Sequence, residues 1–89
     1  MIVHIGGDKM IPDKEIMMIL EGEGAGASAH TRRFLEGLRQ KGCLEQVSPE
    51  GIKSYVITGG SGGMMAYASP ISSQTLYKRA GFSAINDNG

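Results

Sequence analysis

The sequence predicts an α+β domain: a small, mostly antiparallel sheet with a central helix and a short C-terminal helix. Short apolar runs alternate with glycine- or proline-containing turns, which is typical of strands joined by reversals. Two other segments space their apolar residues three and four apart, with a serine before the segment and a glycine after it, as helices do. Residues 1–82 are expected to form this one domain, and residues 83–89 a flexible tail.

The start of the chain predicts a hairpin. Residues 2–5 have the composition of a short strand, and the pair Gly6 and Gly7 permits the reversal that a hairpin needs. A second extended stretch covers residues 9–20 and is broken at Pro12, because proline cannot donate to a strand ladder. The two stretches are expected to pair across the glycines.

The strand predicted over residues 15–20 has two apolar faces. The side chains that alternate along it are Ile16, Met18 and Leu20 on one face, and Met17 and Ile19 on the other. Such a strand is expected at the centre of a sheet or, as the alternative, against a neighbouring subunit, and the central position is favoured. Residues 21–27 are small and acidic with nothing to bury, so they are predicted to form a mobile connection.

The central helix is predicted over residues 29–41. Ser28 can cap its N-terminus, because a serine hydroxyl accepts a hydrogen bond from one of the free amides there. The apolar residues Phe34, Leu35 and Leu38 then fall at the spacing of a single helix face. Glycine 42 follows as the C-terminal stop.

Three further strands are predicted in the second half of the chain, over residues 44–47, 52–58 and 64–68. Residues 48–51 and 59–63 supply the proline and glycine that tight reversals require. Pro70 ends the last of these strands.

A short helix is expected to close the domain. Ser72 or Ser73 can cap it, and it runs through Ala80 to a stop at Gly81. Its apolar residues Leu76 and Ala80 are expected to seat it on the core.

Composition limits the classes of protein to which the chain can belong. A domain of 89 residues with six methionines and five aromatic residues has a small core, and self-association would bury more apolar surface. Nine basic and nine acidic residues leave no net charge, unlike a monomeric nucleic-acid binder. Cys43 is the only cysteine, so an internal disulfide is excluded. No apolar run is long enough to span a membrane, and we expect a cytoplasmic protein without membrane partners.

Catalytic and metal-binding chemistry has little support in the sequence. His4, His30 and Cys43 lack the spaced partner ligands of a zinc site, and the acidic residues of the first quarter form no converging pair. The glycine-rich residues 59–63 precede a strand without the Lys-Ser/Thr of a phosphate-binding loop, so a hairpin turn is favoured over a phosphate cradle. We therefore expect no enzyme, no metal and no cofactor.

The basic residues are better organised and are the candidate DNA-binding residues: Arg32, Arg33, Arg39, Lys41, Lys53, Lys78 and Arg79. Arg32 and Arg39 are seven residues apart, which places them on one face of the central helix, away from its apolar stripe. The alternative is an ordinary solvated helix face on which Arg32 pairs with Glu36 at i,i+4 spacing.

The segment ASPISSQTLYKRA at residues 68–80 and the start MIVHIGGD at residues 1–8 resemble the DUF370 family of small bacterial extracellular matrix regulators, the RemA and RemB proteins. The RemB branch is the most similar, and the resemblance runs from residue 1 to about residue 82. It matches Arg32 and Arg33 to a basic pair in the family's middle helix, and Arg39 and Lys41 to two further basic positions.

Two positions depart from the RemA pattern. Residues 50–54 keep only Lys53 where RemA proteins have an arginine-rich turn, and Glu15 stands where they tend to carry a basic residue. These losses weaken the expectation of tight RemA-type DNA binding and are shared with the RemB branch.

The resemblance implies a DNA-binding transcription regulator of matrix and biofilm genes that assembles into a ring-like homo-oligomer, with a related paralogue as a further partner. The contacts would go mainly to phosphates, because the chain has no groove-reading motif. Assembly matters because a monomer touching about two or three phosphates would bind negligibly at physiological salt. Two alternatives stay open: an oligomeric scaffold with little DNA binding and, more distantly, a small enzyme with a phosphate ligand at residues 59–63.

Overall fold

The computed structural model describes residues 1–22, 28–60 and 62–81. In chain order the elements are β1 (Ile2–Gly6), β2 (Lys9–Pro12), the 3₁₀ turn η1 (Asp13–Glu15), β3 (Ile16–Glu21), α1 (Ala29–Gln40), β4 (Leu44–Gln46), β5 (Ser54–Thr58), β6 (Met65–Ser69) and α2 (Ser73–Ala80). The domain is α+β, as predicted, with two α-helices and mostly antiparallel strands in the described residues. The predicted tail, 83–89, and most of the predicted connection, 23–27, lie outside those residues.

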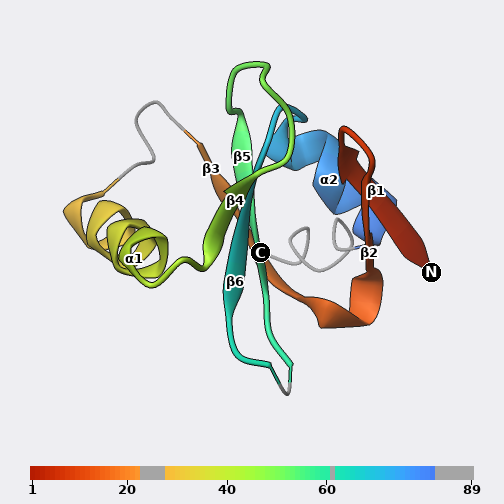
Figure 1. The fold of residues 1–89 in the computed structure, drawn as a ribbon. Helices are drawn as coiled ribbons and strands as arrows, with labels where there is room; N and C mark the ends of the chain where they lie inside the picture. The colour runs from red at the N-terminus through yellow and green to blue at the C-terminus, as the bar shows by residue number, and fades with distance from the viewer. Residues whose placement is uncertain (23–27, 61, 82–89) are drawn as a thin grey trace, which may run out of the picture.

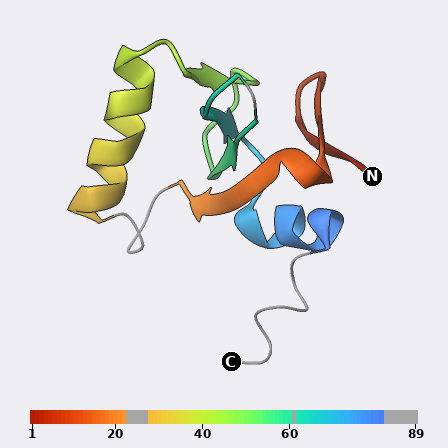
Figure 2. The same ribbon diagram turned by 90° about the horizontal axis from the view of Figure 1, so that it is seen from below.

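The elements form three layers. A four-stranded sheet with the order β3-β5-β6-β4 lies in the middle, and its strands are antiparallel except for the parallel pair β4 and β6. Helix α1 covers one face, while α2 and the β1–β2 hairpin cover the other (Figures 1 and 2). Neither helix in the described part of the chain is long and apolar enough to cross a membrane.

The predicted hairpin across the N-terminal glycines is confirmed. β1 and β2 pair antiparallel, with Val3 opposite Ile11 and His4 opposite Met10. Gly6 and Gly7 both have positive φ, 123° and 54°, which a side chain would disfavour. The hairpin turns Val3 and Ile11 inward and leaves Met10 exposed on its outer face.

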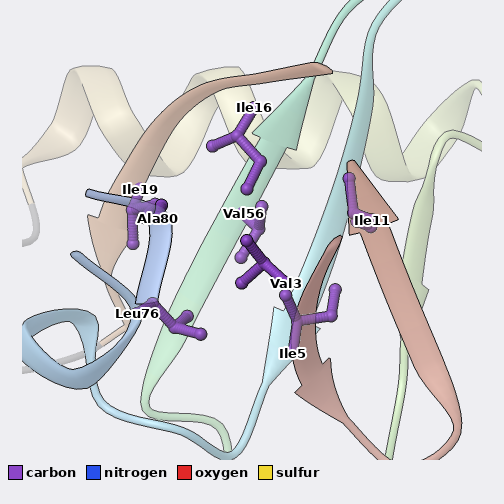
Figure 3. Close-up of a cluster of buried hydrophobic side chains, with 8 residues drawn as sticks. All are labelled: Val3, Ile5, Ile11, Ile16, Ile19, Val56, Leu76 and Ala80. Atoms are coloured by element: carbon purple, nitrogen blue, oxygen red, sulfur yellow. The ribbon is translucent and has the colours of Figure 1, made fainter. Parts of the chain in front are cut away.

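The larger hydrophobic cluster lies between the sheet and the hairpin with α2. Figure 3 shows its buried members: Val3, Ile5, Ile11, Ile16, Ile19, Val56, Leu76 and Ala80. Buried hydroxyls tie this layer together. Ser69 Oγ donates to the Ile5 carbonyl (2.6 Å) and accepts from the Ile71 amide (3.0 Å), and the Tyr77 hydroxyl donates to the Ile19 carbonyl (2.8 Å).

The smaller cluster lies between the sheet and α1. Leu38 of α1 packs against Ile57 of β5 and Ala66 of β6, and all three are buried. Around them Phe34, Leu35 and other apolar side chains are only half-buried. Helix α1 is therefore attached over a smaller buried surface than α2.

Both helices begin where the sequence predicts; α2 also ends at Ala80 as predicted, and α1 ends at Gln40, one residue earlier than predicted. Ser28 and Ser72 are the N-caps, and each hydroxyl accepts from the amide three residues on, at 3.1 and 3.2 Å. Ser72 is thus the cap of α2, while Ser73 is its first residue. Gly42 and Gly81 follow the helices with φ of 76° and 79°, the left-handed conformation of a C-terminal stop.

The favoured prediction of a central strand at residues 15–20 is wrong. β3 hydrogen-bonds only to β5 and is an edge strand of the sheet. Its register shifts between Ile16 and Met18, and Met17 and Met18 stay 53% and 42% exposed. The strand does have two apolar faces, as its pattern indicates. The interior strands of the sheet are instead β5 and β6, and Val56 and Ile57 of β5 are fully buried.

Replacing Gly37 by alanine is expected to stabilise the protein. Gly37 lies inside α1, and a Cβ there would meet no atom within 4 Å outside the helix backbone. Because glycine loses more backbone entropy than alanine in a helix, we expect Gly37→Ala to raise the free energy of unfolding by about 0.5–1 kcal/mol in urea titrations. Gly42→Ala is the control, since the same methyl group at a positive φ should lower stability; a destabilising Gly37→Ala would contradict the prediction.

Candidate nucleic-acid interface

Helix α1 presents three arginines to solvent. Phe34 and Leu38 turn toward the sheet, and the helical spacing places Arg32, Arg33 and Arg39 outside this apolar stripe. All three side chains are exposed. Within the described residues, no hydrogen bond or ion pair engages the side chain of Arg32 or of Arg33, so both guanidinium groups can bind an anion.

Arg39 is held by an acidic neighbour on the same helix. Its Nε and Nη2 donate to the two carboxylate oxygens of Glu36, at 2.9 and 2.5 Å, and Gln40 adds a third hydrogen bond at 3.3 Å. The hydrogen bond from Arg39 lowers the pKa of Glu36, and the same pair raises the pKa of Arg39. The alternative prediction of an Arg32–Glu36 pair is wrong, because the planar guanidinium of Arg39 reaches both oxygens in a fork that suits i,i+3 spacing.

A groove of about 490 Å³ runs between α1 and the sheet near β4. Leu35, Leu44, Ile52 and Tyr55 supply its apolar lining, and Arg32, Glu36, Arg39 and Gln46 its polar lining. The groove thus brings Arg32 and Arg39 together beside apolar side chains, as their spacing predicts. Sequence reasoning missed the apolar lining; the alternation of Tyr55 with the buried Val56 would have placed Tyr55 on the α1 face.

Lys41 and Lys53 do not line the groove but are adjacent in the chain to elements that do. Lys41 is exposed and follows directly after the last turn of α1. Lys53 is also exposed and is adjacent in the chain to the groove residue Ile52. The prediction placed Lys53 within a strand over residues 52–58. In the structure this strand, β5, begins at Ser54, so Lys53 precedes it.

The structure separates Lys78 and Arg79 from the other basic residues. Both are exposed on α2, which covers the opposite face of the sheet from α1 (Figure 1). Arg79 Nη1 donates to the His4 carbonyl (2.9 Å) and so ties α2 to β1. One flat surface of a single subunit therefore cannot use the α1 arginines and the α2 pair together.

His4 and Cys43 each have local partners in the described residues. His4 Nε2 donates to the Gly7 carbonyl (2.8 Å), and Cys43 packs half-buried in the smaller cluster. No three His, Cys, Asp or Glu side chains in the described chain come close enough to hold a metal ion. The glycine turn joins β5 to β6 as predicted, while Ser61 within it lies outside the description.

Neither models of protein families nor curated proteins match the chain. The surface of α1 offers exposed guanidinium groups beside a partly apolar groove. Guanidinium groups bind the oxygens of phosphates and carboxylates.

Proposed function

We propose that the protein is a DNA-associated transcription regulator that acts as a ring-like homo-oligomer and contacts the phosphate backbone. The observation that carries the proposal is the pair Arg32 and Arg33, exposed and without an acidic partner among the described residues. The resemblance to the RemA and RemB regulators supplies the expected role in extracellular matrix and biofilm genes, in the cytoplasm and without catalysis. A related paralogue would be a further subunit of the assembly.

Electrostatics explains why the proposal includes assembly. The chain has no net charge, so one subunit gains little from long-range attraction to DNA. Each neutralised phosphate contributes about −0.9 to the slope of log affinity against log salt, so two contacts from one subunit amount to weak binding. Repetition of α1 around an assembly would multiply these contacts at high effective concentration.

Removing the two free arginines is expected to weaken DNA binding at least about tenfold near physiological salt. Arg32→Gln/Arg33→Gln takes away two phosphate contacts per subunit without introducing repulsion, so the salt slope should also become shallower by about 2 for each subunit bound. Fluorescence anisotropy with a labelled duplex across a salt series measures both. Lys78→Gln on the opposite face is the matched control and should change little.

Glu36→Gln tests the same surface in the other direction. The variant releases Arg39 from its bidentate partner while keeping a side chain of similar size. If α1 faces DNA, affinity should rise and the salt slope should steepen by about 1 per bound subunit. Equal affinity of the wild type and all three variants, or absence of binding at low salt, would contradict the DNA proposal.

A second candidate is an oligomeric scaffold that binds a protein and has little affinity for DNA. The pairing of Glu36 with Arg39 favours it, because that pair removes one of three cations from the helix face. If the protein is such a scaffold, we expect it to be assembled and to bind duplex DNA negligibly at about 50 mM salt. Its affinity for DNA should then be the same in the Glu36→Gln variant.

A further inference from the structure

The groove between α1 and the sheet has an aromatic side chain on its wall. Tyr55 of β5 is half-buried and packs against the smaller cluster, so its ring lies on the α1 face of the sheet. Its register partner is Ala68 of β6, which in turn pairs with Gln46 of β4. Side chains paired in register share a face of the sheet, and the methyl group of Ala68 is too small to fill the space between its two neighbours. The groove therefore has room beside the tyrosine ring.

Two of the three charged residues that line this groove neutralise each other. The guanidinium of Arg39 donates to both carboxylate oxygens of Glu36. The third, Arg32, has no acidic partner among the described residues, and the exposed Arg33 follows it in the chain. The groove is thus suited to a neutral group that is joined to an anion bound by Arg32 and Arg33.

Hydrogen-bonding groups lie beside the tyrosine ring. The Gln46 amide nitrogen donates to the carbonyls of Ser48 (2.9 Å) and Glu50 (3.4 Å), which leaves the Gln46 Oε1 as an acceptor at the groove. The Tyr55 hydroxyl forms no hydrogen bond with another described residue. A nucleobase fits such a site, because it has a flat π-face that stacks on an aromatic ring and an edge that forms hydrogen bonds.

We infer that the groove receives an unpaired base of single-stranded DNA, stacked on Tyr55, while Arg32 and Arg33 contact the flanking phosphates. A nucleotide strand has the chemistry that the groove requires, a neutral flat group joined to anions on both sides. Bases within a duplex are already stacked and paired, so they reach such a site only after flipping out. The inference rests on the phosphate contacts of the proposed function and names the part of DNA that the adjoining groove binds.

Two labelled single strands of equal length, an oligothymidylate and an abasic strand, separate base contacts from phosphate contacts. Both strands carry the same phosphates, so the salt-dependent part of binding is shared. Stacking of a base on an aromatic side chain strengthens binding about fivefold or more, so anisotropy should show at least this preference for the oligothymidylate. An oligouridylate is expected to bind no more tightly, and tighter binding would assign the groove to RNA instead. Equal affinity of the wild type for the first two strands would overturn the inference.

Tyr55→Leu tests the stacking side chain. It removes the ring but keeps an apolar side chain, so affinity for the oligothymidylate should fall about fivefold or more, while affinity for the abasic strand should not change. Tyr55→Phe keeps the ring and should retain most of the affinity. The matched control is Tyr67→Leu, because Tyr67 is also half-buried but packs against the larger cluster on the opposite face. Circular dichroism checks that the variants are folded. Equal affinity of Tyr55→Leu and Tyr67→Leu for the oligothymidylate would contradict the inference.

The outcomes separate this inference from the proposed phosphate contacts. Arg32→Gln/Arg33→Gln should weaken binding of both single strands, since both present phosphates. A loss of affinity in the arginine variant but not in Tyr55→Leu would overturn the base site alone. A loss in Tyr55→Leu but not in the arginine variant would overturn the phosphate contacts alone. Absence of binding to the single strands and to duplex DNA at low salt would overturn both.

Discussion

Leu76→Ala is expected to lower the free energy of unfolding by about 2–5 kcal/mol, the range found when a buried leucine leaves a cavity. Leu76 is fully buried, and it projects from α2 into the larger cluster, where it meets side chains from the hairpin and the sheet (Figure 3). A small domain has only about 5–15 kcal/mol of net stability, so this single change removes a large part of it. Urea titration followed by circular dichroism measures the effect.

The control for Leu76→Ala is the same substitution at Leu20. Leu20 is half-buried at the margin of the smaller cluster, so its truncation leaves a site that solvent can fill. We expect its effect to be about half as large or less, since less apolar surface is returned to water. Equal losses at the two positions would show that α2 does not anchor the larger cluster as the packing indicates.

Gly7→Ala is expected to destabilise the protein by several kcal/mol, of which about 1–2 kcal/mol comes from the left-handed backbone. Gly7 has φ of 54°, and a Cβ there would overlap the carbonyl oxygen of Val47. Because that atom belongs to the backbone, the clash can be relieved only by moving the hairpin away from the chain that follows β4. The midpoint of thermal or urea unfolding measures the loss.

Gly42→Ala separates the two contributions. Gly42 has φ of 76°, but a Cβ there would meet no atom within 4 Å. This variant therefore carries the conformational penalty without the clash, and it should be clearly more stable than Gly7→Ala. If the two variants were equally stable, the close approach of the hairpin turn to Val47 would not limit the fold.

Local signals predict much of this fold. The caps Ser28 and Ser72 and the glycine at 42 act through atoms within a few residues, so the sequence carries them directly. The glycine-containing hairpin turn is local in the same way. The fold class follows from these elements because their apolar faces leave few ways of packing together.

The order of strands could not be predicted in the same way. Ile16 to Leu20 is apolar on both faces, which favours a central strand, although a strand that meets a neighbouring subunit has the same pattern. Which strand lies in the middle depends on contacts between residues far apart, such as Ile19 with Val56 and the parallel pairing of Leu44 with Ala66. A single sequence gives no spacing rule for those contacts.

In the candidate site, too, the sequence predicts the local features and not those that depend on the whole fold. Helical spacing correctly places Arg32 and Arg39 on one side of α1, beside the groove. The choice of Arg39 over Arg32 as the partner of Glu36 depends on side-chain rotamers, which residue types and spacing do not specify. The isolation of Lys78 and Arg79 depends on which face of the sheet α2 covers, and that is set by the whole topology.

The hydrogen bonds from Ser69 to Ile5 and from Arg79 to His4 also bear on how the chain folds. They join residues 64 and 75 positions apart, and Leu76 closes the same layer. Contacts of such long sequence separation slow folding, because the loop entropy is lost before they form. During synthesis the larger cluster cannot be completed until α2 has left the ribosome, so its folding should be a late and cooperative step.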